Sequence, residues 1–267
     1  TRQCRSTIVS VLRIPSVVAV TRLPLVNWST PQGVMVLCRS EAWNIVDSIR
    51  RKEQPVATRS QWIIDKSEAI GRDGMVAAMQ PLAAEAGIEM LRRGGNAIDA
   101  AAATAFAVGV VEPFMSGVGG IAFLTYRDAS TGETICLDGS TVLPRAIRPE
   151  LFDLLPPDQR GGMYGWRATK GDANNTGWLA PGVPGTPALL GNAHKRFGRL
   201  PWRDVLEPAI RLAEDGFEVN HYIAMMTSAS YDHLGQFPES RRTFFKPSGA
   251  PYAPSMGGPA ERMKQPD

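Results

Sequence analysis

Side chains that could carry nucleophilic, acid–base or metal chemistry are few and widely spaced in this sequence. The three cysteines (Cys4, Cys38 and Cys136) form no CxxC pair, and the three histidines form no HExxH motif. We therefore expect neither a structural zinc site nor a disulfide framework, and we expect no metal and no cofactor. No GxSxG motif marks a serine nucleophile either. Taken alone, the residues reveal no pair of nucleophile and base.

One glycine-rich stretch, residues 117–120 (GVGG), invites comparison with a phosphate-binding loop. A phosphate loop follows a strand and opens a helix, so that its backbone N–H groups point at the anion. Here the glycines follow a helical segment and precede a strand-like one, and no GxxxxGK[ST] motif occurs. Tight backbone packing is the better interpretation, and a nucleotide-binding module is disfavoured.

The elements that must position any site are clearest between residues 75 and 111. A short apolar run at 75–79 predicts a strand, and Pro81 then opens a helix that the glycines at 94–95 end. The segment 97–111 is apolar on all sides apart from two residues, which predicts a helix buried on every side. Asn96 is its expected N-cap, and Asp99 in the first turn suits the positive end of the helix dipole.

The remaining elements predict a layered α+β domain rather than a parallel Rossmann sheet. Two β-rich runs, 121–127 and 134–138, are separated by a turn and predict an antiparallel hairpin. Two more helices are expected at 187–197 and 202–214, each closed by a glycine. The part from Pro238 onward is rich in Pro, Gly and Ser and is expected to be loop.

Composition excludes several classes of protein. The chain has 267 residues, 43% hydrophobic and 21% charged, which is enough for a sizeable core and too apolar for a disordered chain. The formal net charge is +3 and the basic residues are scattered, so no nucleic-acid partner is expected. No apolar run reaches the roughly 18 residues of a membrane span, and no clear signal peptide is present. The localisation is therefore left unassigned, and residues 1–61 are expected to be a weakly structured extension preceding a domain at 62–267.

Several ordered blocks in that domain resemble the γ-glutamyltranspeptidase family. The longest is GMVAAMQPLAAEAGIEMLRRGGNAIDAA at 74–101. The blocks that follow it in order are VVEP (110–113), SGVGG (116–120), PGVPG (181–185), LEPAIRLAEDG (206–216) and QPD (265–267). The resemblance covers roughly residues 62–267, and so many blocks in the same order are specific.

The resemblance implies a partial αββα N-terminal-nucleophile hydrolase sandwich. In this family a precursor cuts itself into a large and a small subunit, and the new N-terminal threonine of the small subunit is the nucleophile. Its α-amine, which titrates near neutrality, serves as the base. The chain is expected to be the front part of the large subunit, incomplete at its C-terminus, with no catalytic residue of its own. Its expected partners are the small subunit, in an αβ heterodimer, and a small-molecule amide substrate.

One position departs from the family pattern. Family members usually carry an arginine in a D-[FGS]-R-E-x-x-P block, where it binds the α-carboxylate of the substrate. The corresponding stretch here, 138–144, reads DGSTVLP, so Ser140 stands at the arginine position. A hydroxyl cannot replace a bidentate guanidinium–carboxylate pair, whose charge-assisted bonds contribute about 1.5–3 kcal/mol each. Ser140 and Arg145 are the expected substrate-binding residues, and Arg148 is a further cation nearby.

The sequence therefore predicts a γ-glutamyltransferase or glutathione hydrolase of the N-terminal-nucleophile class, acting through an acyl-threonine intermediate. Because of Ser140, an acylase-type or oxamate-type amidohydrolase of the same family is the first alternative. A catalytically inert binding fragment is the second, since the nucleophile lies outside this chain. Purified alone, the chain is expected to be inactive on amides and to expose apolar surface that promotes aggregation.

Overall fold

The computed structural model describes residues 8–12, 17–21, 68–117, 119–161 and 165–266. Most of the extension expected at 1–61, including Cys4 and Cys38, lies outside these residues. The backbone divides into one compact unit, Thr1–Pro24 with Gly71–Asp267, and a second, Leu25–Ile70. All the helices and strands named below belong to the first unit.

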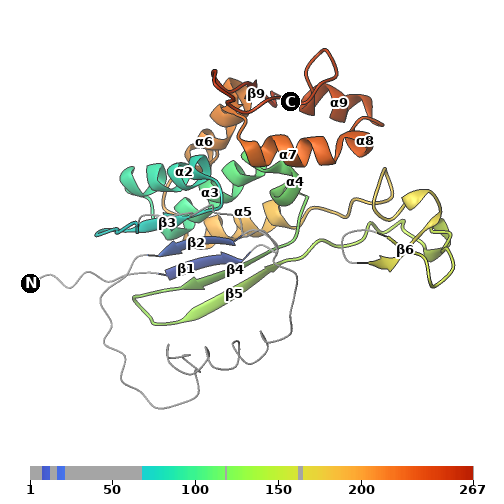
Figure 1. Ribbon diagram of the computed structural model, residues 1–267. Coiled ribbons are helices and arrows are strands. Elements are labelled where there is room, and N and C mark those ends of the chain that lie inside the picture. Colours follow the sequence, from blue (N-terminus) through green and yellow to red (C-terminus); the bar gives the residue numbers. More distant parts are fainter. Residues whose placement is uncertain (1–7, 13–16, 22–67, 118, 162–164, 267) are drawn as a thin grey trace, which may run out of the picture. The chain divides into compact units, whose positions relative to one another are not determined.

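A five-stranded antiparallel sheet forms the base of this unit (Figure 1), in the order β3-β2-β1-β4-β5. Its strands are β1 (Ile8–Leu12), β2 (Val17–Thr21), β3 (Met75–Ala77), β4 (Ala122–Arg127) and β5 (Thr134–Gly139). The predicted strand at 75–79 and the predicted hairpin are confirmed. The sequence pattern assigned no structure to β1 and β2, whose five-residue runs are short, yet β1 is the central strand of the sheet and β2 lies beside it.

The face of the sheet that carries the core is clearest on β4. Ala122, Leu124 and Tyr126 alternate as buried residues along this strand. Helix α5 (Thr186–Phe197) packs against β4 and β5, and the rings of Tyr126 and Phe197 lie 4.8 Å apart. The predicted helix at 187–197 is therefore confirmed, and it covers the hairpin.

Helix α2 (Pro81–Arg92) ends at the predicted glycines. Gly94 adopts φ +87°, and the N–H of Gly95 donates to the carbonyl of Met90 at 2.9 Å. The N–H of Gly94 donates to the carbonyl of Leu91 at 3.2 Å, which completes a Schellman motif. This sharp stop turns the chain back into α3 (Ala97–Val111), which packs along α2.

Helix α3 is the centre of the unit, as its apolar sequence predicts. It packs against α2, α6 (Trp202–Asp215), β1 and β2, and twelve of its fifteen residues are buried. A Cβ on Gly87 of α2 would meet the Thr104 hydroxyl of α3, which shows how closely the two helices approach.

The C-terminal part contains helices and strands that the sequence pattern did not predict. Helices α7 (His221–Ala229), α8 (Tyr231–Leu234) and α9 (Pro238–Phe244) follow each other, and β9 (Arg262–Met263) pairs with β8 (Phe217–Glu218). The prediction of loop from Pro238 onward was wrong for 238–244, because proline is well tolerated at the first position of a helix. Helices on an antiparallel sheet confirm the α+β class.

Candidate functional site

Three of the sequence blocks meet where β5 ends. Three stretches are joined there by hydrogen bonds and close backbone contacts. They are the end of β5 with the residues after it (138–142), the described residues of the glycine loop (117, 119 and 120), and the segment that leads into the first residue of α5 (181–186). They are far apart in the sequence, so tertiary packing alone brings them together. We refer to this convergence as the β5-end site.

Ser140 sits at the centre of the β5-end site and is bound to Asp138. Its hydroxyl donates to Oδ1 of Asp138 at 2.6 Å, and its backbone N–H donates to the same oxygen at 2.8 Å. These two bonds, the hydroxyl first, hold the pKa of the Asp138 carboxyl below its ordinary value. Ser140, the expected counterpart of the family arginine, therefore presents a hydroxyl that is already bound to a carboxylate.

The segment before α5 packs directly on the Ser140 backbone. A Cβ on Gly185 would lie 2.3 Å from the carbonyl oxygen of Gly139 and 2.5 Å from that of Ser140. The N–H of Val183 donates to the carbonyl of Val142 at 2.8 Å. Glycine is required at 185 because no side chain fits between the two backbones.

The glycine loop contributes carbonyl groups to this packing. The Thr186 hydroxyl donates to the carbonyl of Gly120 at 2.7 Å, and the Thr141 hydroxyl donates to that of Gly119 at 3.3 Å. The loop follows a helix, α4 (Pro113–Ser116), and precedes β4, as the sequence indicated. That order differs from the strand–loop–helix arrangement of a phosphate-binding loop.

The two nearby arginines, Arg145 and Arg148, differ in whether their guanidinium groups are already hydrogen-bonded. The guanidinium of Arg148 donates to the backbone carbonyls of Arg145 and Ile147, at 3.0 and 2.9 Å. Arg145 is exposed, and within the described ranges its guanidinium has no hydrogen-bond or ion-pair partner. Of the two cations, Arg145 is therefore the one able to bind an anion without breaking an existing bond.

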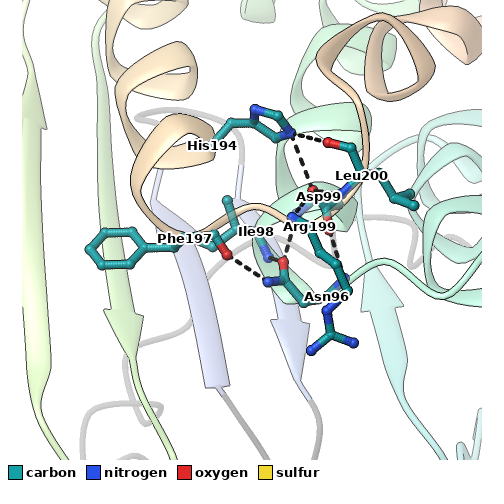
Figure 2. Close-up of polar contacts among 7 residues, drawn as sticks. All are labelled: Asn96, Ile98, Asp99, His194, Phe197, Arg199 and Leu200. Atoms are coloured by element: carbon teal, nitrogen blue, oxygen red, sulfur yellow. Dashed lines mark hydrogen bonds and ion pairs between the residues drawn. The ribbon is translucent and has the colours of Figure 1, made fainter.

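A buried carboxylate network links the start of α3 to the end of α5 and the chain that follows it (Figure 2). Asp99 is fully buried and accepts from the backbone N–H of Asn96 at 2.7 Å and from that of Arg199 at 3.0 and 3.1 Å. Nε2 of His194 lies 3.4 Å from Asp99 and 2.8 Å from the carbonyl of Leu200. The predicted N-cap is confirmed as a capping box between Asn96 and Asp99. This network holds α5 and the chain before α6 against the start of α3.

A second buried carboxyl was missed in the sequence. Glu112 links α3 to α4, is 0% exposed, and neither of its carboxyl oxygens has a hydrogen-bond partner in the described part of the chain. Burial raises the pKa of this carboxyl above its ordinary value of 4.5. The available signal was an acidic residue between Val111 and Pro113, in a stretch that is otherwise apolar.

Within the residues that the structure describes, no group of three or more His, Cys, Asp or Glu side chains is placed to hold a metal ion. In the same residues, no helix combines the length and hydropathy that crossing a membrane requires.

Comparison with known proteins identifies relatives that include a glutathione hydrolase proenzyme and an acylase proenzyme. The glutathione hydrolase proenzyme of Bacillus subtilis (strain 168) is 37% identical over 186 residues, which are 70% of this chain and 30% of the relative. The acylase ACY 1 proenzyme of Pseudomonas sp. (strain SE83) is 36% identical over 204 residues, 76% of this chain and 35% of the relative. This chain therefore spans about a third of the length of these relatives.

Solved structures of both kinds share the fold. The γ-glutamyltranspeptidase of Helicobacter pylori matches with a TM-score of 0.62 and 28% identity, covering 76% of this chain and 52% of that one. The cephalosporin acylase of Bacillus halodurans matches with a TM-score of 0.61 and 30% identity, covering 80% and 37%. The family model described as gamma-glutamyltranspeptidase matches residues 83–266. This chain therefore belongs to the gamma-glutamyltranspeptidase family, whose N-terminal-nucleophile hydrolase fold it shares in part.

Proposed function

We propose that this chain is the front part of the large subunit of an amide-cleaving hydrolase or acyltransferase. The observation that carries the proposal is the β5-end site, where three blocks of the family pattern converge around Ser140. In this proposal the chain binds and orients the substrate, and the nucleophile comes from the remainder of the precursor. Relatives named as proenzymes support a precursor of this kind.

The proposed reaction follows the chemistry of an N-terminal nucleophile. The free amino terminus of the small subunit takes the proton of its own side-chain hydroxyl, and the oxygen attacks the amide carbonyl of the substrate. The amine leaves with that proton, and an acyl-enzyme ester remains. Water or a second amine then attacks the ester and releases the acid or the transferred amide.

We propose an amide other than a γ-glutamyl compound as the preferred substrate. At the position of the family arginine the site presents the Ser140 hydroxyl, bound to the Asp138 carboxylate, and this pair repels a second carboxylate. The exposed Arg145 is the remaining candidate for holding an anionic group. The acylase relatives support this preference, and glutathione hydrolysis is the alternative that the other relatives support.

The proposed partner is the small subunit of the same precursor, in an αβ heterodimer. The region between β5 and α5 exposes apolar side chains, among them Leu143 (72%), Trp166 (61%) and Trp178 (93%). Several large apolar side chains exposed in one region of the chain are typical of an interaction surface. We propose that the small subunit covers them.

The test uses the full-length precursor, processed and purified, against two substrates. γ-Glutamyl-p-nitroanilide reports the glutathione-hydrolase type, and butyryl-p-nitroanilide, which has the same leaving group but no carboxylate on its acyl group, serves as the acylase substrate. Turnover of the acylase substrate with little release from the γ-glutamyl compound is expected. The reverse result would restore glutathione hydrolysis, and failure to turn over either would leave the inert binding protein as the better description.

A further inference from the structure

A cavity of about 600 Å³ lies where helices α2 and α7 begin. The ends of α3 and α6, strand β8 and the segment before β9 also line it, and these elements can be followed in Figure 1. None of the described residues of the β5-end site is part of its wall. Cavities of about 300–1,000 Å³ with apolar walls and a few convergent polar groups are typical of sites for small molecules.

The wall of the cavity is mostly apolar. Its apolar side chains come from α2, α3, α6, β8, α7 and the C-terminal segment, and include Leu82, Val111, Leu212, Phe217, Ile223 and Pro254. A ligand that filled this space would remove apolar surface from water on both sides of the contact. The wall therefore favours a ligand with an apolar body.

The side chain of Gln80 brings a free hydrogen-bond donor to this wall. Gln80 is only 7% exposed. The backbone N–H of Ile223 donates to Oδ1 of Asn220 at 2.9 Å, so that Nδ2 of Asn220 is the atom left to donate. It donates to Oε1 of Gln80 at 3.2 Å. This series of bonds fixes the orientation of the Gln80 amide and leaves its nitrogen without an acceptor among the described residues.

The free nitrogen of Gln80 opens into the cavity. In the described part of the chain, the only fully buried side-chain polar atoms without a partner are the two carboxyl oxygens of Glu112. The Gln80 nitrogen is therefore in reach of the cavity that its residue lines. An amide buried to this extent is stabilised when its unpaired N–H finds an acceptor.

Two backbone N–H groups add to this donor. Leu82 and His221 lie in the first turns of α2 and α7, and both line the cavity. Within the described ranges, neither backbone N–H has an acceptor. The N-terminal end of a helix carries partial positive charge, so two such ends at one cavity favour an anion there.

The charged side chains of the wall are Arg262 and Glu218. Nη2 of Arg262 donates to the carbonyl of Gly216, and Nη1 lies 4.0 Å from Oε1 of Glu218. The side chains of Arg262 and Glu218 are 52% and 70% exposed, so solvent screens this pair. The groups with donors to spare are therefore Gln80, the two helix ends and Arg262, and together they select a ligand that accepts hydrogen bonds.

We propose that this cavity binds a small organic carboxylate with an apolar body. The carboxylate accepts from Nε2 of Gln80 and from the first turns of α2 and α7, and the body packs against Leu212, Phe217 and Ile223. The proposal goes beyond the proposed function and does not depend on it, since it requires neither a nucleophile nor turnover.

Methyl NMR of the full-length protein, titrated with octanoate, tests the proposal. Octanoate is expected to shift the δ1-methyl signal of Ile223, in the cavity wall, and to leave that of Ile98, inside α3, unchanged. Octanol has the same apolar chain without the charge, and is expected to bind about tenfold to hundredfold more weakly. Acetate has the charge without the long chain, and is expected to bind more weakly by about a hundredfold or more.

Two pairs of variants locate the binding. Gln80→Glu keeps the acceptor for Asn220 but places a carboxylate against the ligand, so octanoate is expected to bind at least about tenfold more weakly while octanol is unaffected. Gln159→Glu makes the same change of charge at an exposed residue outside the wall, and should alter neither affinity. Ala260→Phe fills the cavity and should remove the binding of both ligands, whereas the exposed Ala250→Phe should not.

Equal affinity for octanoate and octanol, or a titration that leaves Ile223 unshifted, would overturn the proposal. Equal effects of Gln80→Glu and Gln159→Glu would also overturn it. If Gln80→Glu fails to fold, the comparison of ligands and the two alanine variants still decide the question. A protein that binds octanoate beside Ile223 but cleaves neither amide substrate would support this site and contradict the proposed function, so the two can fail separately.

Discussion

The Oγ atom of Ser140 lies 2.6 Å from Oδ1 of Asp138 and donates a hydrogen bond to it. The two residues are only two positions apart, and the Ser140 backbone N–H binds the same oxygen. We propose that this pair stands where the family pattern has a carboxylate-binding arginine, so that the site presents a negatively charged acceptor instead of a cation. We expect the choice of substrate to depend on this replacement of the arginine by Ser140.

Replacing Ser140 with alanine is expected to raise the pKa of Asp138 toward its ordinary value, because the largest cause of its lowering is removed. An NMR titration of the Asp138 carboxyl in the chain measures this. Asp128, whose carboxyl is held by Ser130 in the same way, is the internal control and should not move. An unchanged Asp138 titration would contradict the assignment of the bond.

Ser140→Arg in the full-length protein is expected to increase kcat/KM for γ-glutamyl-p-nitroanilide. A guanidinium paired with the substrate carboxylate contributes about 1.5–3 kcal/mol, which corresponds to roughly tenfold to hundredfold. Ser140→Lys is the matched control, since it adds the charge without the bidentate geometry and should give a smaller gain. Equal activity in the wild type and both variants would exclude Ser140 from substrate binding.

Asp99→Asn is expected to destabilise the chain by about 3 kcal/mol, measured by urea denaturation. Asp99 is fully buried and accepts backbone N–H bonds from Asn96, Arg199 and Leu200, to which an amide nitrogen cannot bind. The control is Asp204→Asn, where a partly exposed carboxylate pairs with Arg93, and where less than about 1 kcal/mol is expected. A similar loss of unfolding free energy in the two variants would show that the network in Figure 2 contributes little to stability.

Gly185→Ala is expected to cost about 1–3 kcal/mol and to disturb the β5-end site, because its methyl group would overlap the carbonyls of Gly139 and Ser140. Gly191→Ala is the control. It lies inside α5 with no atom within 4 Å of an added Cβ, and should stabilise the chain by roughly 0.5–1 kcal/mol. Thermal denaturation should show a lower Tm for Gly185→Ala and a higher Tm for Gly191→Ala than for the wild type.

Acid destabilisation is expected to depend in part on Glu261. Its carboxylate accepts from the N–H of Ala253 at 2.6 Å and from Lys246 at 2.9 and 3.0 Å, and these bonds, the first foremost, lower its pKa. A lowered pKa contributes stability above the unfolded value, which is lost as the pH falls through the folded value, below about 4.5. Glu261→Gln should flatten the stability curve in that range, whereas the exposed Glu150→Gln should not.

How far the sequence predicted the structure depends on the strength of the local signals. The helices at 81–92, 97–111, 186–197 and 202–215 have long periodic or wholly apolar patterns with clear caps, and each was predicted within one or two residues. Strands β1 and β2 are five residues long, and their pairing comes from the rest of the sheet. Helix α9 has no apolar stripe, so composition suggested loop instead.

The candidate site was predicted only as a set of separate motifs. The order of elements around the glycine loop, and its unsuitability for phosphate, followed from neighbouring segments. The contacts of Thr186 with Gly120 and of Gly185 with Ser140 arise from tertiary packing and leave no periodic signal. Glu112 was passed over because a single acidic residue at a helix end is usually solvated, and burial decides otherwise here.

Strands β1 and β2 each need a partner that is synthesised later. Leu12 of β1 pairs with Phe123, more than a hundred positions on, and Thr21 of β2 pairs with Met75, more than fifty positions on. Contacts between such distant parts of a chain form slowly, because the entropy cost of closing a long loop comes before the contacts stabilise it. During translation β1 and β2 therefore emerge from the ribosome well before the β4–β5 hairpin with which β1 pairs. Removing β1 and β2 would split the sheet, because β3 would no longer be connected to the β4–β5 hairpin.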